Sequence, residues 1–324
     1  MNKLNLFICI FSMCILVTAC NSKNPNGEKE KMTMDSTIVM EYVPLADPFI
    51  LLHNDIYYAY GTSTDEGFEV YYSDNLRSWK KHPQMLLKKE DSYAEKWFWA
   101  PEVYHNPSNN KFYLFYSAEE HICVATGDSP LGPFKQDEKK PMLEEKGIDS
   151  SLFIDEDGTP YIFFDRFTNG NVIWVARLED DWMTIKEETL TKCIEASDGW
   201  ETKLGKVVEG GSVIKRGNIY YMIYSGNDFH SPDYAVGYAT ATSLLGPWTK
   251  SENNPILHRP QEGLVGVGHG AYFLDKENNY KYVFHAHFDT TIVQPRTMHI
   301  VNMAINDTGI RFGTDTIINP CIIK

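Results

Sequence analysis

Five stretches of the chain share one pattern, in which a polar residue opens an apolar strand that leads through a turn into an aromatic-rich strand. The openings recur at intervals of 47 to 60 residues, at Asp47, Glu102, Asp149, Glu209 and His269. Asn, Asp and Gly fill the turns, as is typical of β-hairpins. The strands after the turns are rich in Tyr, Phe and β-branched residues, which favours β structure.

A second element follows in each unit, an alternating strand and a polar turn that lead to a large aromatic residue. The aromatics are Trp79, Phe134, Trp182 and Trp248, and the fifth copy, from Met298, lacks one. A period near fifty residues with four strands per unit predicts an all-β fold, a five-bladed β-propeller with four antiparallel strands per blade. A β-sandwich would not repeat these landmarks, and the chain lacks the βαβ alternation of a parallel α/β fold.

Composition narrows the class of partner. The chain has 324 residues and a formal net charge of −14, which argues against nucleic acid or an anionic membrane surface as a partner. A neutral ligand such as a glycan is compatible with this charge.

The first forty residues differ from the rest. Lys3 and an apolar run from Leu4 to Thr18 predict a secretory signal peptide over 1–19. The segment 17–20 resembles a bacterial lipobox, which makes Cys20 the expected lipidated N-terminus; a simple cleaved signal is the alternative. Residues 20–40 predict a flexible tether and 41–324 a single catalytic domain. We therefore expect an exported lipoprotein, periplasmic or on the cell surface, that meets the membrane only through its lipid.

The openings carry the candidate chemistry. In a propeller the first strand of each blade lines a central channel, so Asp47, Glu102, Asp149 and Glu209 should face one another. Clustered carboxyl groups split their pKa values, so that some stay ionised and one keeps a proton. That division is what glycoside hydrolysis requires.

Five short motifs, one per blade, strengthen this hypothesis. They are DPFI at 47–50, WAPE at 99–102, IDSSLF at 148–153, EGGS at 209–212 and GVGHG at 266–270. Together they resemble glycoside hydrolase family 43, over nearly the whole of the chain that follows the tether. The resemblance implies a five-bladed propeller that cleaves arabinose- or xylose-containing glycans with inversion.

The resemblance also implies roles for individual residues. Asp47 corresponds to the general base, Glu209 to the general acid, and Asp149 to the carboxylate that tunes the pKa of the acid. His269 corresponds to a histidine at the channel centre that helps hold a calcium ion, largely through water, and Arg296 to an arginine that reaches the sugar. Further contacts with the sugar are expected from Glu102, for which a structural role is the alternative, and from the aromatic residues Phe49 and Trp99.

We expect a monomeric, exo-acting, inverting hydrolase with an oligosaccharide or polysaccharide substrate and no organic cofactor. An α-L-arabinofuranosidase comes first and a β-xylosidase second, while the motifs leave β-galactofuranosidase and endo-acting activities open. The alternative class is a non-catalytic glycan-binding lipoprotein on the same propeller.

Overall fold

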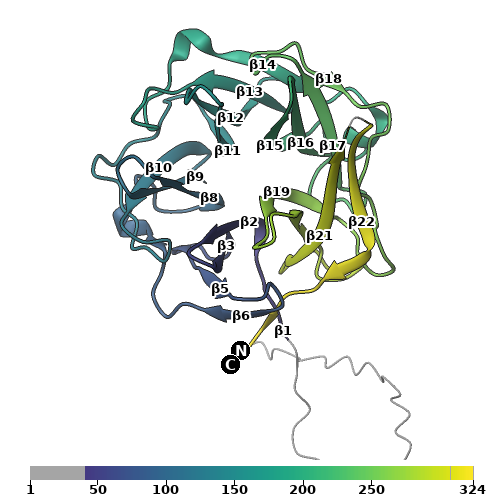
Figure 1. The fold of residues 1–324 in the computed structure, drawn as a ribbon, viewed down its shortest axis with the longest axis horizontal. Coiled ribbons are helices and arrows are strands. Elements are labelled where there is room, and N and C mark those ends of the chain that lie inside the picture. Colours follow the sequence, from purple (N-terminus) through teal and green to yellow (C-terminus); the bar gives the residue numbers. More distant parts are fainter. Residues whose placement is uncertain (1–40, 307, 324) are drawn as a thin grey trace, which may run out of the picture. The chain divides into compact units, whose positions relative to one another are not determined.

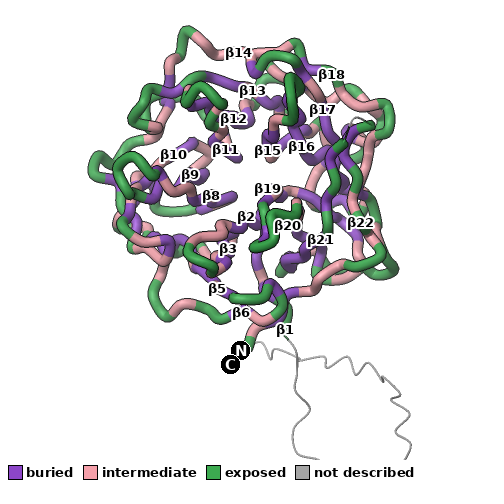
Figure 2. The backbone as a smooth tube through the Cα atoms, viewed as in Figure 1, coloured by how far each residue is buried: buried purple, intermediate pink, exposed green. Residues whose placement is uncertain are grey.

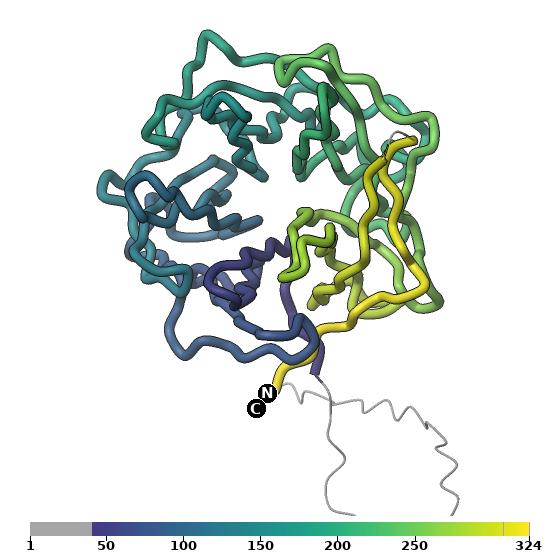
Figure 3. The backbone as a smooth tube through the Cα atoms, in the orientation of Figure 1, coloured from purple at the N-terminus to yellow at the C-terminus, as the bar shows by residue number. Residues whose placement is uncertain are grey.

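The structure is a computed structural model that describes residues 41–306 and 308–323. The predicted signal peptide, the tether and Cys20 lie outside these residues. Within them the chain forms β-sheets arranged in a ring, with the chain running once around it (Figures 1 and 3). No helix in this part of the chain is long and apolar enough to cross a membrane.

Each blade is an antiparallel meander that starts at the ring centre. The first blade contains β2 (Ala46–His53), β3 (Ile56–Thr62), β5 (Tyr71–Ser73) and β6 (Ser78–Lys81). The second contains β8 (Trp99–Asn106), β9 (Lys111–Ala118) and β10 (His121–Gly127). The third contains β11 (Gly147–Ile154), β12 (Pro160–Phe167), β13 (Asn171–Arg177) and β14 (Thr191–Glu195).

The last two blades follow the same plan. The fourth contains β15 (Val208–Arg216), β16 (Ile219–Gly226), β17 (Ala235–Ala241) and β18 (Thr249–Lys250), and the fifth β19 (Gly268–Leu274), β20 (Tyr280–Ala286), β21 (Thr297–Asn306) and β22 (Gly309–Ile318). The predicted five-bladed propeller with four strands per blade is therefore confirmed. In the second blade the outer strand shrinks to one bridge, between Thr126 and Lys135.

The ring closes on the first blade. Strand β23 (Cys321–Ile322) pairs in parallel with β6 and antiparallel with β1 (Glu41–Tyr42). A small separate sheet joins β4 (Gly67–Phe68) to β7 (Leu87–Lys88). The strands at the two ends of the described chain thus pair at the outer edge of the same blade, which connects the last blade to the first.

Aromatic cores between neighbouring blades hold the ring together. Trp79 and Phe134 are fully buried, and the indole N–H of Trp248 donates to the carbonyl of Leu244 at 3.1 Å. Three of the four predicted landmark aromatics are therefore buried, whereas Trp182 is only partly buried and packs on Tyr113, with ring centroids 5.2 Å apart. The strand interiors are buried between the sheets (Figure 2). Cys123 and Cys321 are buried free thiols.

Every innermost strand carries a β-bulge near its start. In each, the strand register shifts across two residues, the first of which has a positive φ between 39° and 64°. The five positive-φ residues are Asp47, Ala100, Asp149, Gly210 and His269. This corrects the equivalence suggested by the sequence: Glu209 lies one residue before its bulge, and Glu102 two residues after its own.

The same five residues lock each blade to the one before it. The backbone N–H of each bulge residue donates to a side chain on the second strand of the preceding blade. The acceptors, in blade order from the first, are Thr62, Ser117, Asp165, Ser225 and His285, at 2.7–3.3 Å. A bulge leaves an N–H outside the strand ladder, so this contact, which we call the inter-blade latch, satisfies a donor that burial would otherwise leave unpaired.

Candidate active site

A pocket of about 380 Å³ opens at the bulge end of the inner strands, and we call it the central pocket. Six residues singled out from the sequence line it: Asp47, Trp99, Asp149, Glu209, His269 and Arg296. The bulges explain this convergence, because they turn the first residues of all five inner strands toward the same end of the channel.

Asp47 is held by positively charged and hydrogen-bonding neighbours. Its carboxylate accepts from Nη1 of Arg296 at 2.8 Å and from the hydroxyl of Thr62 at 2.7 Å. Burial alone would raise the pKa of Asp47, but the charge of Arg296 and the contacts with His269 and His285 outweigh it and hold the pKa well below its usual value. Asp47 is therefore ionised at neutral pH.

Glu209, in contrast to Asp47, lies in surroundings that favour its protonated form. The hydroxyl of Tyr234 donates to Oε1 at 2.7 Å and the amide of Asn171 donates to Oε2 at 2.9 Å. Burial and the negative charge of Asp47 nevertheless raise the pKa of Glu209 to about 7, although both hydrogen bonds and Arg296 work the other way. Glu209 therefore keeps a proton over much of the acidic and neutral range.

Asp149 lies between these groups, on the bulge of the third blade. Its Oδ2 is 3.9 Å from Nδ1 of His269, which is itself 3.4 Å from Oδ1 of Asp47. Burial, then the carboxylates of Glu209 and Asp47, raise the pKa of Asp149 well above its usual value, although Asp165 and Arg296 work the other way. Burial also lowers the pKa of His269, so this ring is neutral near pH 7. A side chain at Gly210 would meet the His269 ring at 2.9 Å, so glycine is required where the ring packs.

Trp99 supplies an aromatic wall to the central pocket. Its ring stacks on that of Trp97, with centroids 6.0 Å apart and planes 14° apart. Trp97 is 41% exposed, so the pair extends from the pocket to the surface. Such a surface suits the apolar face of a sugar.

The structure does not bring Phe49 and Glu102 to the central pocket. Phe49 belongs to a separate cavity of about 340 Å³ toward the other ends of the inner strands, which we call the lower cavity. Glu102 is partly buried and accepts from Tyr104, and Tyr104 also lines the lower cavity. Both residues follow their bulges by two positions, which turns them away from the pocket mouth.

The surroundings of His269 offer few direct ligands for calcium. Among the described residues, the only His, Cys, Asp and Glu side chains grouped tightly enough for a metal are Asp149, Asp165 and Glu209, and His269 is not among them. Its Nδ1 faces the Asp47 and Asp149 carboxylates. Since calcium takes six to eight oxygen ligands, an ion at His269 would be held largely through water. Calcium there stays a prediction and enters no step below.

Several supporting residues were missed from the sequence. Thr62 and Asn171, on β3 and β13, and Tyr234, just before β17, contact the two carboxyl groups from segments that show no polar motif. Asp165 and His285 lie on second strands that look like ordinary apolar segments. Their one shared signal is spacing, because the latch acceptors follow their own blade's bulge residue by 15 to 17 positions. This spacing can be recognised only once the positions of the bulges are known.

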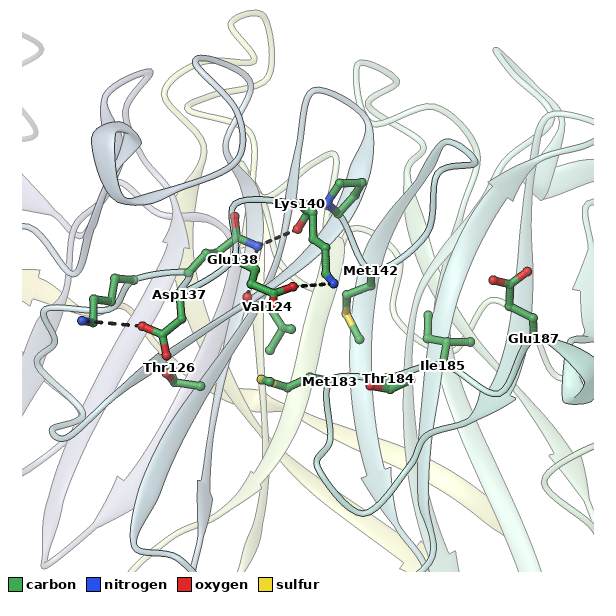
Figure 4. A pocket seen from close by; sticks show the side chains of 13 residues that line it. Val124, Thr126, Asp137, Glu138, Lys140, Met142, Met183, Thr184, Ile185 and Glu187 are labelled. Atoms are coloured by element: carbon green, nitrogen blue, oxygen red, sulfur yellow. Dashed lines mark hydrogen bonds and ion pairs between the residues drawn. The ribbon is translucent and has the colours of Figure 1, made fainter.

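A larger pocket, the outer groove, lies between the second and third blades (Figure 4). Its volume is about 500 Å³, and loop residues around Lys140 and Met183 line it. Four of its five charged side chains form two ion pairs, Lys140 with Glu138 at 2.6 Å and Lys135 with Asp137 at 3.6 Å. No aromatic side chain lines it among the described residues, and it contains none of the clustered carboxyl groups. The chemistry therefore belongs to the central pocket.

The central pocket combines one carboxylate held ionised with one carboxyl group that keeps its proton. Asp47 can accept a proton from water, and Glu209 can donate one to a leaving oxygen. Pairs of carboxyl groups with divergent pKa values carry out glycoside hydrolysis.

Comparison with known proteins agrees with this chemistry. The chain is similar to a solved structure of endo-1,4-beta-xylanase from Bacteroides thetaiotaomicron, with 50% identity, a TM-score of 0.84 and coverage of 88% of this chain and 99% of that one. It is 25% identical to beta-D-galactofuranosidase xynD of Aspergillus niger over 82% of this chain and 80% of the relative. A xylosidase/arabinosidase of Bacteroides ovatus is 27% identical over 56% of this chain and 64% of the relative.

A sequence model of the glycosyl hydrolases of family 43 matches residues 40–310, which include all five bulges and every residue of the central pocket. The chain therefore belongs to glycosyl hydrolase family 43.

Proposed function

We propose that this protein is an inverting, exo-acting glycoside hydrolase that removes arabinofuranose or xylose from plant oligosaccharides and polysaccharides. One observation carries the proposal: Asp47 and Glu209 line the same pocket, and their surroundings hold them in opposite protonation states. A pair of carboxyl groups that only bound sugar would gain nothing from this division.

The proposed reaction uses the two groups at once. Asp47 accepts a proton from a water molecule as its oxygen attacks the anomeric carbon, and Glu209 donates its proton to the glycosidic oxygen as that bond breaks. The product sugar carries the new hydroxyl with inverted configuration. Arg296 keeps Asp47 ionised before the step, and Tyr234 and Asn171 hold the carboxyl group of Glu209 in place.

The family membership and the names of the similar proteins support a furanose or xylose substrate. Those names cover xylan, xylosides, arabinosides and galactofuranosides, so the substrate is best settled by a panel. Aryl α-L-arabinofuranoside, β-D-xyloside and β-D-galactofuranoside should be assayed beside xylan and arabinan. We expect the arabinofuranoside to react fastest, and release of monosaccharide alone from the polymers would support exo action.

Two isosteric variants test the roles. Asp47→Asn and Glu209→Gln should each reduce kcat/KM on an oligosaccharide by about 10²- to 10⁴-fold, the usual contribution of a general base or acid. A 2,4-dinitrophenyl glycoside needs no proton on its leaving group, so it should rescue Glu209→Gln but not Asp47→Asn. Asp137→Asn, in the outer groove, is the matched control and should retain activity.

Three outcomes would contradict the proposal. Near-wild-type activity in either variant would remove that residue from its role. A product anomer of retained configuration, seen by proton NMR at early times, would exclude inversion. Oligosaccharide binding without turnover of any panel member would favour the alternative, a non-catalytic glycan-binding propeller.

We further propose that Cys20 carries a lipid that anchors an exported, monomeric enzyme in the periplasm or at the cell surface. The support is the lipobox-like segment 17–20 after an apolar run. The full-length protein should partition with membranes, and Cys20→Ala should move it to the soluble fraction. Membrane retention of that variant would refute the anchor, and size-exclusion chromatography of a chain that starts after the tether tests the monomer.

A further inference from the structure

Asp165 is a buried carboxyl group that the proposed reaction does not use. It lies on β12 and is 0% exposed. One side-chain oxygen of Asp165 lies within 4.8 Å of an oxygen of Asp149 and of an oxygen of Glu209. Its Oδ2 accepts the backbone N–H of Gly210 at 3.3 Å, while its Oδ1 has no hydrogen-bond partner.

The inter-blade latch does not explain why this residue is an aspartate. The same latch uses a hydroxyl group in three other blades, from Thr62, Ser117 and Ser225. One acceptor oxygen is enough for the contact, and burying a carboxyl group without full hydrogen bonding is costly. The second oxygen of Asp165 must therefore serve something other than the latch.

The charges around Asp165 indicate its protonation state. Three buried carboxyl groups this close together cannot all be ionised. His269 lies 3.9 Å from Asp149, and Glu209 has two hydrogen-bond donors, whereas no ion pair involves Asp165 among the residues described. Burial, and then the carboxylates of Asp149 and Glu209, raise the pKa of Asp165 well above its usual value.

One further titratable side chain lies near Asp165, the thiol of Cys193 on β14. Burial, followed by the charge of Asp165, raises the pKa of this thiol, so it stays protonated and adds no charge. From the bulge strands the facing groups are Asp149 on β11 and Glu209 on β15. Arg296 opposes the rise in the pKa of Asp149 and of Glu209, whereas no positively charged group is among the main influences on the pKa of Asp165.

Resting on the proposed acid role of Glu209, we propose that Asp165 is a positioning residue that keeps a proton and donates it in a hydrogen bond to Asp149. This bond keeps Asp149 ionised beside Glu209, and the negative charge of Asp149 in turn keeps the proton on Glu209. Through Gly210, the same residue also fixes the bulge that directs Glu209 into the pocket. Without Asp165, Asp149 would compete with Glu209 for the one remaining proton.

Two variants separate this role from a structural one. Asp165→Asn is neutral and retains both a donor and an acceptor, so it should stay within a few-fold of wild type. Asp165→Ser keeps the single latch oxygen that two other blades use but lacks the second oxygen. It should lose about 10- to 100-fold in kcat/KM on an oligosaccharide, the range for a hydrogen bond to a charged group, and little on a 2,4-dinitrophenyl glycoside.

Two activity patterns would overturn the proposal. Equal losses by Asp165→Ser on both substrates would show a structural role alone. A loss in Asp165→Asn as large as that in Asp165→Ser would show that the ionised form is the one required. Thermal unfolding of each variant establishes that it is folded before rates are compared.

A measurement that needs no turnover tests the proton itself. In protein labelled with carbon-13 at the aspartate carboxyl groups, one resonance should be that of a protonated acid at pH 7 and should vanish in Asp165→Asn. Absence of that resonance in the wild type, or its persistence in the variant, would refute the proposal. If the wild type hydrolysed no glycoside, the proposed function would fail while this result still decided the state of Asp165.

Discussion

Replacing Glu102 by glutamine should stabilise the protein in mildly alkaline solution. Burial raises the pKa of Glu102 from 4.5 to about 7, although the hydrogen bonds from Tyr104 and Ser151 work against it. A carboxyl group whose pKa is raised by folding stabilises the folded state below its unfolded pKa, and that contribution is lost as the pH rises through the folded value. At pH 8 the folded protein therefore carries an ionised group that its surroundings disfavour.

The magnitude follows from the two pKa values. A difference from 4.5 to about 7, at about 1.4 kcal/mol per unit, gives about 3 kcal/mol at pH 8 and almost nothing at pH 4.5. This is an upper limit, because the side chain is only partly buried and glutamine must still satisfy its own amide. For a domain of this size about 1 kcal/mol corresponds to about 2–4 °C, so the melting temperature should rise by several degrees.

The assay is thermal unfolding of wild type and Glu102→Gln at pH 5 and pH 8. Glu262→Gln is the matched control, since Glu262 is exposed and forms no ion pair among the described residues. The gain should appear in full at pH 8 and be only about a quarter as large at pH 5. An equal gain at both pH values, or a loss at pH 8, would refute the reasoning, and a large loss of kcat/KM would instead return Glu102 to the sugar-binding residues.

Three further predictions concern the central pocket. The alkaline limb of the pH profile of kcat/KM should lie near pH 7, because activity is lost as Glu209 deprotonates. Tyr234→Phe should move this limb up by about 1 pH unit, since the lost hydrogen bond favoured the ionised form of Glu209. An unmoved limb would show that another group sets it. Arg296→Met should move the acid limb to higher pH, because Asp47 loses its main positive neighbour, and an unchanged acid limb would contradict that role. Chelation should lower the activity or melting temperature if calcium binds at His269, and unchanged values would argue against the ion.

The fold could be predicted from the sequence because strongly patterned residues mark each blade repeat. The turns and the landmark aromatics recur at fixed places, and Trp79, Phe134 and Trp248 proved to be buried anchors. The site was predicted only in part. The residues that open the repeats include its carboxyl groups, but the sequence does not show where each one lies relative to the bulge of its strand. A bulge changes the direction of a side chain without changing the residue pattern, so Glu102 could not be separated from Asp47 by spacing.

The difference between Asp47 and Asp149 shows what the repeat leaves undetermined. Both occupy the positive-φ position of a bulge, and both are buried to a similar extent, yet the pKa is lowered in one and raised in the other. The backbone gives them the same geometry, so the difference arises from neighbours on other strands. Arg296 lies against Asp47, whereas Glu209 and Asp165 lie against Asp149. In this ring the repeated backbone geometry places the carboxyl groups, and the differing side chains on neighbouring segments determine the pKa of each group.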